Sequence, residues 1–460
     1  MRALLANIGF VLQISGIFMI LPIIISLVLN ESSATIGLFL AATAFLALGF
    51  ILNALCEKKE LTFKQSSTLI VLVFIILSLI GSLPYIYINI SNGDPVQSFT
   101  DSVFESTSGF TTTGFSVIPN LSAIPRTLLV YRGFTQFIGG IGIILVLLAF
   151  FYPDAKLQEF SRSLGFTKNY KIKRTFFLIL LVYFFYTIIM IISGLIFGYT
   201  DIVNLLSFVF SGLSTGGFTP IDNISSVATQ SPLNGLLIIS MILGATNILI
   251  LLGLFKKKYK EFLKSELTVF LVMAIISITI VTIFFQLSLF DSTFHVFSAM
   301  STTGFSYLSV QNFSGGLKLF LVFLMFVGGA SFSTAGGIKI FRFLLLFKTA
   351  KKAVVDSITE KNSKVELFGK EYTNTELIRA IVIIILMVVV IFISSFIVSL
   401  YGFHPIDSIF ETTSAIATTG LSVGIIGPSL ALELKWLFIF IMLLGRVEIF
   451  AFLIMFSRKK

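Results

Sequence analysis

The chain has 460 residues, of which 56% are hydrophobic and only 12% are charged, and this balance excludes a soluble globular protein. Unbroken apolar runs of about 18 residues or more predict helices that cross a lipid bilayer. The formal net charge of +10 does not indicate a nucleic-acid partner, because the basic residues gather in particular loops.

Ten apolar runs follow one another along the chain. They cover residues 4–29, 33–55, 66–90, 127–151, 176–199, 232–255, 266–290, 316–346, 378–401 and 434–456. Of the 32 Lys and Arg residues, 27 lie at the two termini or in loops 56–65, 152–174, 256–264 and 339–379, whereas the alternate loops hold none. Basic loops stay in the cytoplasm, so this asymmetry predicts ten spans with both termini cytoplasmic.

Four of the lysine-free outer segments repeat one pattern. They begin at Asp101, Asn204, Asp291 and Asp407, and a glycine follows 13 residues later in each. Serine recurs seven residues after the first residue of each segment, and threonine recurs eleven residues after it; we call these distances the seventh and eleventh offsets. An internal repeat fixes an architecture. We therefore predict an all-α integral membrane fold with four tandem membrane–pore-loop–membrane repeats around one pseudo-four-fold pore. Two extra N-terminal helices precede the repeats.

Each outer segment reads as a short helix followed by a loop. Its first Asp or Asn is a good helix N-cap, and the next ten or so residues are compatible with a helix. Such a helix is too short to cross a bilayer, and both flanking spans have their other ends in the cytoplasm. The segment must dip into the membrane from outside and return. Irregular backbone at that depth is tolerated where it lines a cavity.

The loops suit a cation that leaves water and needs replacement oxygen ligands. Rings of backbone carbonyls supply such ligands in potassium channels, and glycine permits the torsions that turn carbonyls inward. The alternative for any one loop is a turn or helix-packing signal. We predict a cation-binding filter, of the kind that binds potassium in channels, made of Thr111, Thr112, Thr113, Gly114, Ser214, Thr215, Gly216, Gly217, Ser301, Thr302, Thr303, Gly304, Ala417, Thr418, Thr419 and Gly420.

The eighth apolar run is too long for one span and carries small polar residues in its middle. Glycine, serine and threonine there disfavour a helix, which predicts a break that marks an ion path or hinge. The alternative is a helix-packing face of small residues. The predicted gate residues are Gly328, Gly329, Ser331, Ser333, Thr334, Gly336, Gly337 and Lys339, together with Arg446 in the last span.

The chain resembles the TrkH/KtrB/HKT superfamily of potassium transporters over essentially its whole length, and its TrkH branch in the two leading spans. Besides the four loops, three segments carry the resemblance: Tyr131–Gly142, Gly328–Lys339 and Gly445–Phe450. The resemblance implies that the glycines Gly114, Gly217, Gly304 and Gly420 set selectivity for potassium. It also implies that residues 328–338 are a mobile loop below the filter, and that Arg446 lines the pore there.

The resemblance further implies a homodimer in a prokaryotic plasma (inner) membrane, with one pore per protomer. A cytosolic ring of nucleotide-binding RCK subunits (TrkA/KtrA-like) would gate it and could dock on the basic loops. No organic cofactor is expected. The predicted units are the helix pair 1–60 and repeats 61–155, 156–262, 263–352 and 353–460.

Several charged residues keep two interpretations each. Glu105, Glu411 and His295 hold the fourth offset of three pore helices, where a carboxylate concentrates cations at the outer mouth or makes hydrogen bonds behind the filter. Lys339 lies near the inner pore mouth or extends to the cytoplasm. Glu448 pairs with a base, or couples potassium to sodium or protons in a symporter. A membrane enzyme is the rival class, but no nucleophile–base or metal-ligand cluster supports it.

Overall fold

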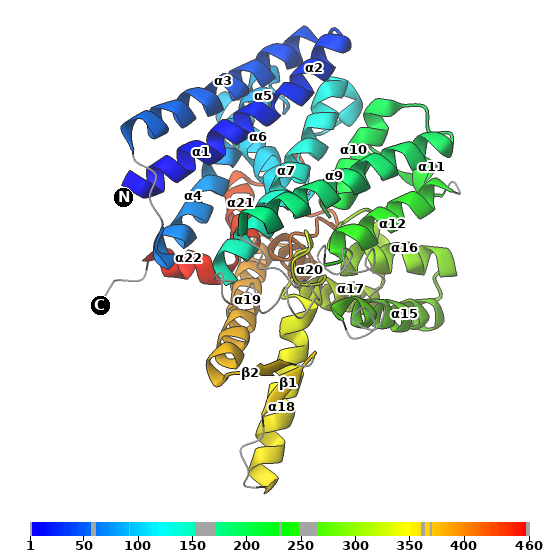
Figure 1. Cartoon of the computed structure of the whole chain (residues 1–460). Coiled ribbons are helices and arrows are strands. Elements are labelled where there is room, and N and C mark those ends of the chain that lie inside the picture. Colours follow the sequence, from blue (N-terminus) through cyan, green and yellow to red (C-terminus); the bar gives the residue numbers. More distant parts are fainter. Residues whose placement is uncertain are drawn as a thin grey trace.

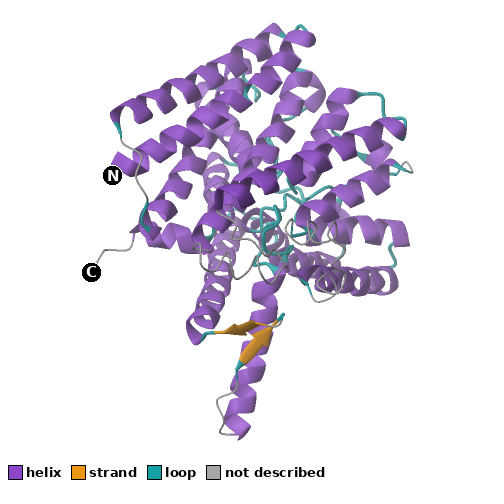
Figure 2. Cartoon of the chain, viewed as in Figure 1, coloured by secondary structure: helices purple, strands orange, loops and turns teal. Residues whose placement is uncertain are grey.

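The structure is a computed structural model, and it describes residues 2–56, 61–91, 93–151, 172–229, 232–247, 265–359, 364–368 and 370–456. Helices dominate the described part of the chain, with loops between them and one short β-hairpin (Figure 2). Among the described residues, five helical segments are long and apolar enough to cross a membrane. A bent pair at the C-terminal end adds a sixth, and four shorter apolar helices accompany them. Each of the ten predicted apolar runs contains a helix, which confirms the all-α prediction.

The N-terminal pair consists of α1 (Arg2–Phe18) with α2 (Ile20–Val28), and α3 (Ser32–Leu55). Figure 1 shows α1 and α3 side by side on the outside of the helical body. The lack of a side chain at Gly9 lets the two helices approach closely, since a Cβ on Gly9 would lie only 2.8 Å from the Gly49 carbonyl oxygen. Glu31, between α2 and α3, accepts hydrogen bonds of 2.8 Å from the backbone of Arg126 and Thr127. This carboxylate satisfies two of the free N–H groups at a helix start and anchors the pair to the first repeat.

Each repeat contributes an outer helix, a pore helix and an inner helix. The first has α4 (Phe63–Gly81) with α5 (Leu83–Ile88), α6 (Pro95–Phe110) and α7 (Arg126–Phe151). The second has α9 (Ile172–Ile196), α10 (Ile202–Leu213) and α12 (Leu233–Ala245). The third has α15 (Glu266–Phe285), α16 (Leu289–Met300) and α17 (Gly315–Val327), and the fourth has α19 (Asn374–Leu400), α20 (Pro405–Ile416) and α21 (Leu432–Val447). Short turns η1 (Leu121–Ala123), α11 (Ser225–Ala228) and η2 (Val310–Asn312) follow the first three loops.

Pore and inner helices form one closed circuit. In turn, α6 packs on α7, α7 on α10, α10 on α12, α12 on α16, α16 on α17, α17 on α20, α20 on α21, and α21 on α6. The outer helices α4, α9, α15 and α19 each pack against the pore helix of their own repeat. The circuit confirms the predicted pseudo-four-fold arrangement, with the repeats following one another in sequence order.

The pore helices begin earlier than the sequence predicts. Their N-caps are Asp94, Asp201, Ser288 and His404, each of which accepts a backbone N–H with its side chain. The predicted caps at Asp101, Asn204, Asp291 and Asp407 are therefore wrong, because all four residues lie within the helices. All four pore helices end at the ninth offset, as the predicted helix-then-loop pattern requires.

Two departures from straight spans lie toward one end of the molecule. Helix α18 (Ile340–Thr359) and the hairpin of β1 (Val365–Leu367) and β2 (Lys370–Tyr372) project from the helical body (Figure 1). Helix α21 and the following α22 (Ile449–Phe456) meet at an angle of 96°, where Glu448 has φ 60°. The predicted units meet outside the described residues, or at their edge, at three boundaries: 60/61, 155/156 and 262/263. Most residues of the basic loops 152–174 and 256–264 also lie outside the described residues. The fourth boundary, 352/353, falls inside α18, so the units remain predictions.

Candidate functional site

The four loops share one backbone conformation. The threonine at the eleventh offset has a left-handed φ in each, with values of 54° at Thr112, 52° at Thr215, 55° at Thr302 and 50° at Thr418. The glycine two residues later is also left-handed, with φ from 79° to 89°. The residues before and between these positions have ordinary negative φ. A backbone that alternates between negative and positive φ turns successive peptide groups to one side. Few residue types other than glycine adopt a positive φ without strain.

The loops close into a ring through their own backbone. An ideal Cβ on Gly114 would lie 2.1 Å from the carbonyl oxygen of Gly216 in the second loop. The other three glycines meet the next loop in the same way, at 2.1 Å for Gly217 and the Thr303 oxygen, 1.9 Å for Gly304 and the Thr419 oxygen, and 2.0 Å for Gly420 and the Thr113 oxygen. Glycine is required at these four positions because any side chain would overlap a backbone oxygen of the neighbouring repeat.

Three pore helices hold the segment that follows the left-handed glycine of their own loop. The buried Glu105 carboxylate accepts from the Ser116 hydroxyl at 3.1 Å and the Val117 N–H at 3.2 Å. Glu411 likewise accepts from the Ser422 hydroxyl and from the Val423 N–H at 2.9 Å, and His295 contacts the Ser306 hydroxyl at 3.2 Å. Both carboxylates have no exposed surface. This geometry supports hydrogen bonding behind the filter over attraction of cations at the outer mouth.

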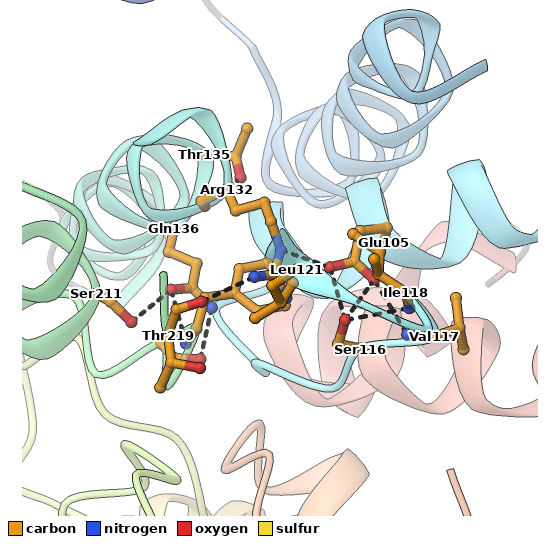
Figure 3. A network of polar contacts seen from close by, with 12 residues as sticks. Glu105, Ser116, Val117, Ile118, Leu121, Arg132, Thr135, Gln136, Ser211 and Thr219 are labelled. Carbon is orange, nitrogen blue, oxygen red and sulfur yellow. Dashed lines mark hydrogen bonds and ion pairs between the residues drawn. The ribbon is translucent and has the colours of Figure 1, made fainter. Parts of the chain in front are cut away.

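Helix α7 reaches the first two loops at once (Figure 3). Arg132 donates from Nε to Glu105 at 2.7 Å and from Nη1 to the Thr219 carbonyl at 2.9 Å. Four residues along the helix, Gln136 donates from Nε2 to the Gly216 carbonyl at 2.5 Å, and its Oε1 accepts from the Ser211 hydroxyl at 2.8 Å. The second loop is thus held by the inner helix of the first repeat.

Ion pairs join neighbouring repeats. Lys435 at the start of α21 pairs with Asp101 of α6 at 2.6 Å, with both side chains 1% exposed. Lys318 of α17 pairs with Asp407 of α20 at 2.8 Å, and Arg126 of α7 pairs with Asp201 at 2.5 Å. In the first, second and fourth repeats, an aspartate of the pore helix or of its N-cap therefore binds a cation from an inner helix of the adjacent repeat.

We expect Lys435→Met to destabilise the protein, because it leaves the Asp101 carboxylate buried without its cation. Removing one partner of a buried pair costs about 3 kcal/mol or more. Thermal unfolding of the detergent-solubilised protein measures the loss. The double variant Asp101→Asn/Lys435→Met should recover most of it, and a single variant as stable as the wild type would contradict this role.

The predicted interruption of the eighth run is present. Helix α17 ends at Val327, and α18 begins only at Ile340. Gly328 and Gly337 have φ of 71° and 72°, and an ideal Cβ on Gly328 would lie 2.2 Å from the Gly336 carbonyl oxygen. We call residues 328–339 the intramembrane loop. Its two ends meet at these glycines, so the chain forms a compact fold of its own rather than a helix-packing stripe.

The intramembrane loop lies against the starts of the second and third loops. The Thr334 hydroxyl is 3.2 Å from that of Thr215, and the Gly336 N–H donates to the Thr302 hydroxyl at 2.6 Å. The corresponding hydroxyls of Thr112 and Thr418 are buried and have no hydrogen-bond partner among the described residues. The loop therefore contacts two of the four equivalent hydroxyls, and the other two have no hydrogen-bond partner among the described residues.

Three charged groups hold the intramembrane loop. The buried Arg446 guanidinium donates to the carbonyls of Thr334 at 3.0 Å and Gly139 at 2.7 Å. Lys339 is buried and donates to the Ala335 carbonyl, so its side chain does not extend to solvent. Glu266 at the start of α15 accepts from the Ser331 N–H at 2.6 Å. Arg446 does not pair with Glu448.

The remaining predicted loop residues support this packing. Ser333 donates to the Ala330 carbonyl at 2.5 Å, and the Gly329 carbonyl accepts from the Ile340 N–H at 3.0 Å. Glu448 pairs with Arg342 of α18 at 2.8 Å, one of the two interpretations that the sequence left open. Sequence reasoning missed Arg132, Gln136 and Glu266. The available signal was a polar side chain within or at the end of an apolar span.

Comparison with known proteins adds a family and a fold. A model of the TrkH cation transport protein family matches residues 35–296 and 265–460. An uncharacterized cation transporter of Methanocaldococcus jannaschii is 32% identical over 99% of this chain and 95% of its own length. The Trk system potassium uptake protein TrkH of Salmonella typhimurium is 26% identical over 99% and 98%. The crystal structure of the potassium transporter TrkH from Vibrio parahaemolyticus matches with a TM-score of 0.85 and 22% identity, over 99% of this chain and 98% of that one.

Proposed function

Because the chain belongs to the TrkH family of cation transport proteins, we propose that it carries potassium through one selective pore per chain across a prokaryotic plasma (inner) membrane. Membership of this family also confirms the prediction that the chain is not an enzyme. The choice of potassium rests on the names of the TrkH relatives and on the four-glycine filter. Potassium is the transported substrate here, not a resident cofactor.

The ring of four loops carries the proposal. The carbonyl oxygens of Thr113, Gly216, Thr303 and Thr419 each lie against the filter glycine of an adjacent repeat, which brings four oxygens into one layer. Such rings replace the hydration shell of a potassium ion. The four threonines at the eleventh offset add hydroxyls on the inner side, and the C-terminal ends of the pore helices add partial negative charge. All 16 predicted filter residues belong to these loops.

The intramembrane loop is the proposed gate. In the arrangement described here, Thr334 and Gly336 bind the filter threonines Thr215 and Thr302, so an ion leaving the filter inward would meet the loop. The Arg446 guanidinium lies beside it and opposes the passage of a cation in a medium of low dielectric constant. Opening requires the loop to exchange these hydrogen bonds for another packing. A partner that binds the open arrangement more tightly shifts that equilibrium.

The partners proposed are a second copy of the chain and a cytosolic ring of nucleotide-binding RCK subunits. Helix α18 follows the intramembrane loop directly and projects from the helical body with the β-hairpin (Figure 1). A ring bound there could pull on the loop through one continuous helix. The alternative function is a symporter coupled to sodium or protons. The Arg342 pair argues against it, since the Glu448 carboxylate is already neutralised.

Recording from purified protein in a planar bilayer tests the function. With potassium on one side and sodium on the other, we expect a reversal potential near that of a potassium-selective pore. Currents that follow the potassium gradient alone exclude the symporter, whereas a requirement for sodium or a pH gradient would support it. A reversal potential near zero would overturn the selective-pore proposal.

A further inference from the structure

The second filter loop differs from the others in how it is held. Glu105, His295 and Glu411 tie the first, third and fourth loops to their own pore helices, but the second pore helix has Phe208 at the same offset. A phenyl ring cannot accept a hydrogen bond as a carboxylate does. The polar contacts that replace it come from α7 of the preceding repeat, namely from Arg132 and Gln136 (Figure 3).

Gln136 contacts the backbone on both sides of the second filter glycine. Its amide nitrogen donates to the carbonyl of Gly216, and its amide oxygen lies 3.3 Å from the N–H of Phe218 and accepts from it. Gly217 lies between these two residues. The Ser211 hydroxyl donates to the same amide oxygen and fixes the orientation of the side chain. The Gln136 side chain is fully buried, so water cannot replace these contacts.

Gln136 also explains why this loop has glycine where the other three have threonine. An ideal Cβ on Gly216 would lie 2.3 Å from the Gln136 Cδ atom and 2.4 Å from its Oε1 atom. The first, third and fourth loops carry Thr113, Thr303 and Thr419 at that position. A threonine in the second loop would need the volume that the amide occupies.

The inner helices differ in residue type at the position that matches Gln136. Gly139, Gly244 and Gly445 cross the ends of their pore helices at equivalent places, where a Cβ would lie 2.0, 2.6 and 2.1 Å from the Phe110, Leu213 and Ile416 carbonyl oxygens. Three residues before them stand Gln136, Met241 and Met442. Met325 stands three residues before Gly328, which ends α17. In the circuit of helices, the inner helix before each of the three loops with threonine carries methionine at this position. The inner helix before the second loop, which has glycine, carries glutamine.

We propose that Gln136 is the positioning residue of the second filter loop, because its side chain holds the Gly216 carbonyl in the four-oxygen ring. Gln136 and Gly216 then take the places that a methionine and a threonine hold at the matching positions of the other repeats, so the two residues can be exchanged only together. This inference rests on the proposed function of the loops as a filter. The amide supplies a fixed donor on one side of Gly217 and a fixed acceptor on the other. The loop therefore keeps its carbonyl in register without a tie to its own pore helix.

A double-mutant cycle on Gln136→Met and Gly216→Thr tests this pair, with potassium and sodium permeability as the readout. Gln136→Met should lower the potassium-to-sodium ratio about fivefold or more, because it removes the hydrogen bond to the Gly216 carbonyl and one such bond contributes about 1 kcal/mol. Gly216→Thr should abolish transport, because its side chain overlaps the amide. The double variant recreates the pairing of the other repeats and should restore selective transport. Non-additivity of this kind is the mark of a coupled pair.

The controls separate a positioning role from a structural one. Gln13→Met makes the same exchange in α1, outside the pore circuit, and should leave the permeability ratio unchanged. A folded Gln136→Met with the wild-type ratio would overturn the inference, as would a double variant no better than Gly216→Thr alone. If both single variants fail to fold, a folded and selective double variant supports the inference, and a misfolded one overturns it.

Gly114→Ser, measured in parallel, distinguishes the two levels of the proposal. If Gly114→Ser leaves the permeability ratio unchanged, the filter itself is wrongly assigned. If it shifts the ratio while every Gln136 variant behaves like the wild type, the filter assignment stands and only the role of Gln136 fails.

Discussion

Replacing Gly336 with alanine is expected to raise resting potassium flux about tenfold or more, the change that about 1.4 kcal/mol makes in a two-state equilibrium. An ideal Cβ at this position would lie 1.9 Å from the Ala417 carbonyl oxygen and 2.4 Å from the Thr418 hydroxyl oxygen. The loop can no longer pack against the inner end of the filter. Gly336 does not have a positive φ, so alanine fits its backbone, and the strain falls on the closed packing alone.

Potassium flux into proteoliposomes, without cytosolic partners, measures the effect. The permeability ratio should stay near the wild-type value, since the filter glycines are unchanged. Gly235→Ala in α12 is the matched control, because a Cβ there meets nothing within 4 Å. Deletion of residues 331–335 should act in the same direction. A folded Gly336→Ala protein that conducts at the wild-type rate would show that the intramembrane loop is not the gate.

Replacing Gly114 with serine is expected to lower the potassium-to-sodium permeability ratio about tenfold or more, the factor that corresponds to about 1.4 kcal/mol. Two effects act together. The Cβ would lie 2.1 Å from the Gly216 carbonyl oxygen, and the backbone at φ 89° is one that L residues rarely adopt. The first and second loops must separate, which widens the ring and weakens its preference for a larger, less tightly hydrated cation.

The shift of reversal potential in mixed potassium and sodium measures this change. Gly427→Ser is the control, since that glycine has open space around it and no positive φ. Gly139→Ser serves a different purpose, because a Cβ there would meet the Phe110 carbonyl oxygen at 2.0 Å and should impair folding before it alters selectivity. Normal conductance with an unchanged ratio in Gly114→Ser would remove the first loop from the filter.

Two charged residues show where a sequence pattern was ambiguous. The sequence pattern predicts helix caps at Asp101 and Asp407, because Asp before a run of helix-compatible residues usually is one. The caps are Asp94 and His404, and the repeated aspartates instead bind lysines of the neighbouring repeat. Lys435 lies 334 residues from Asp101 along the chain, so no local pattern could have paired them.

The sequence by itself determined the four-part architecture, the loop residues that form the ring and the interruption at residues 328–339. These features follow from apolar run length, from a repeat with fixed offsets and from the poor helix propensity of Gly, Ser and Thr, all of which are local properties of the chain. Only the tertiary structure decided which group holds which loop. Gln136, Glu266 and Arg446 act on backbone atoms of segments distant in sequence, and a backbone N–H or carbonyl carries no residue signature. Their roles appear only once the repeats close into a ring and bring those atoms within hydrogen-bonding distance.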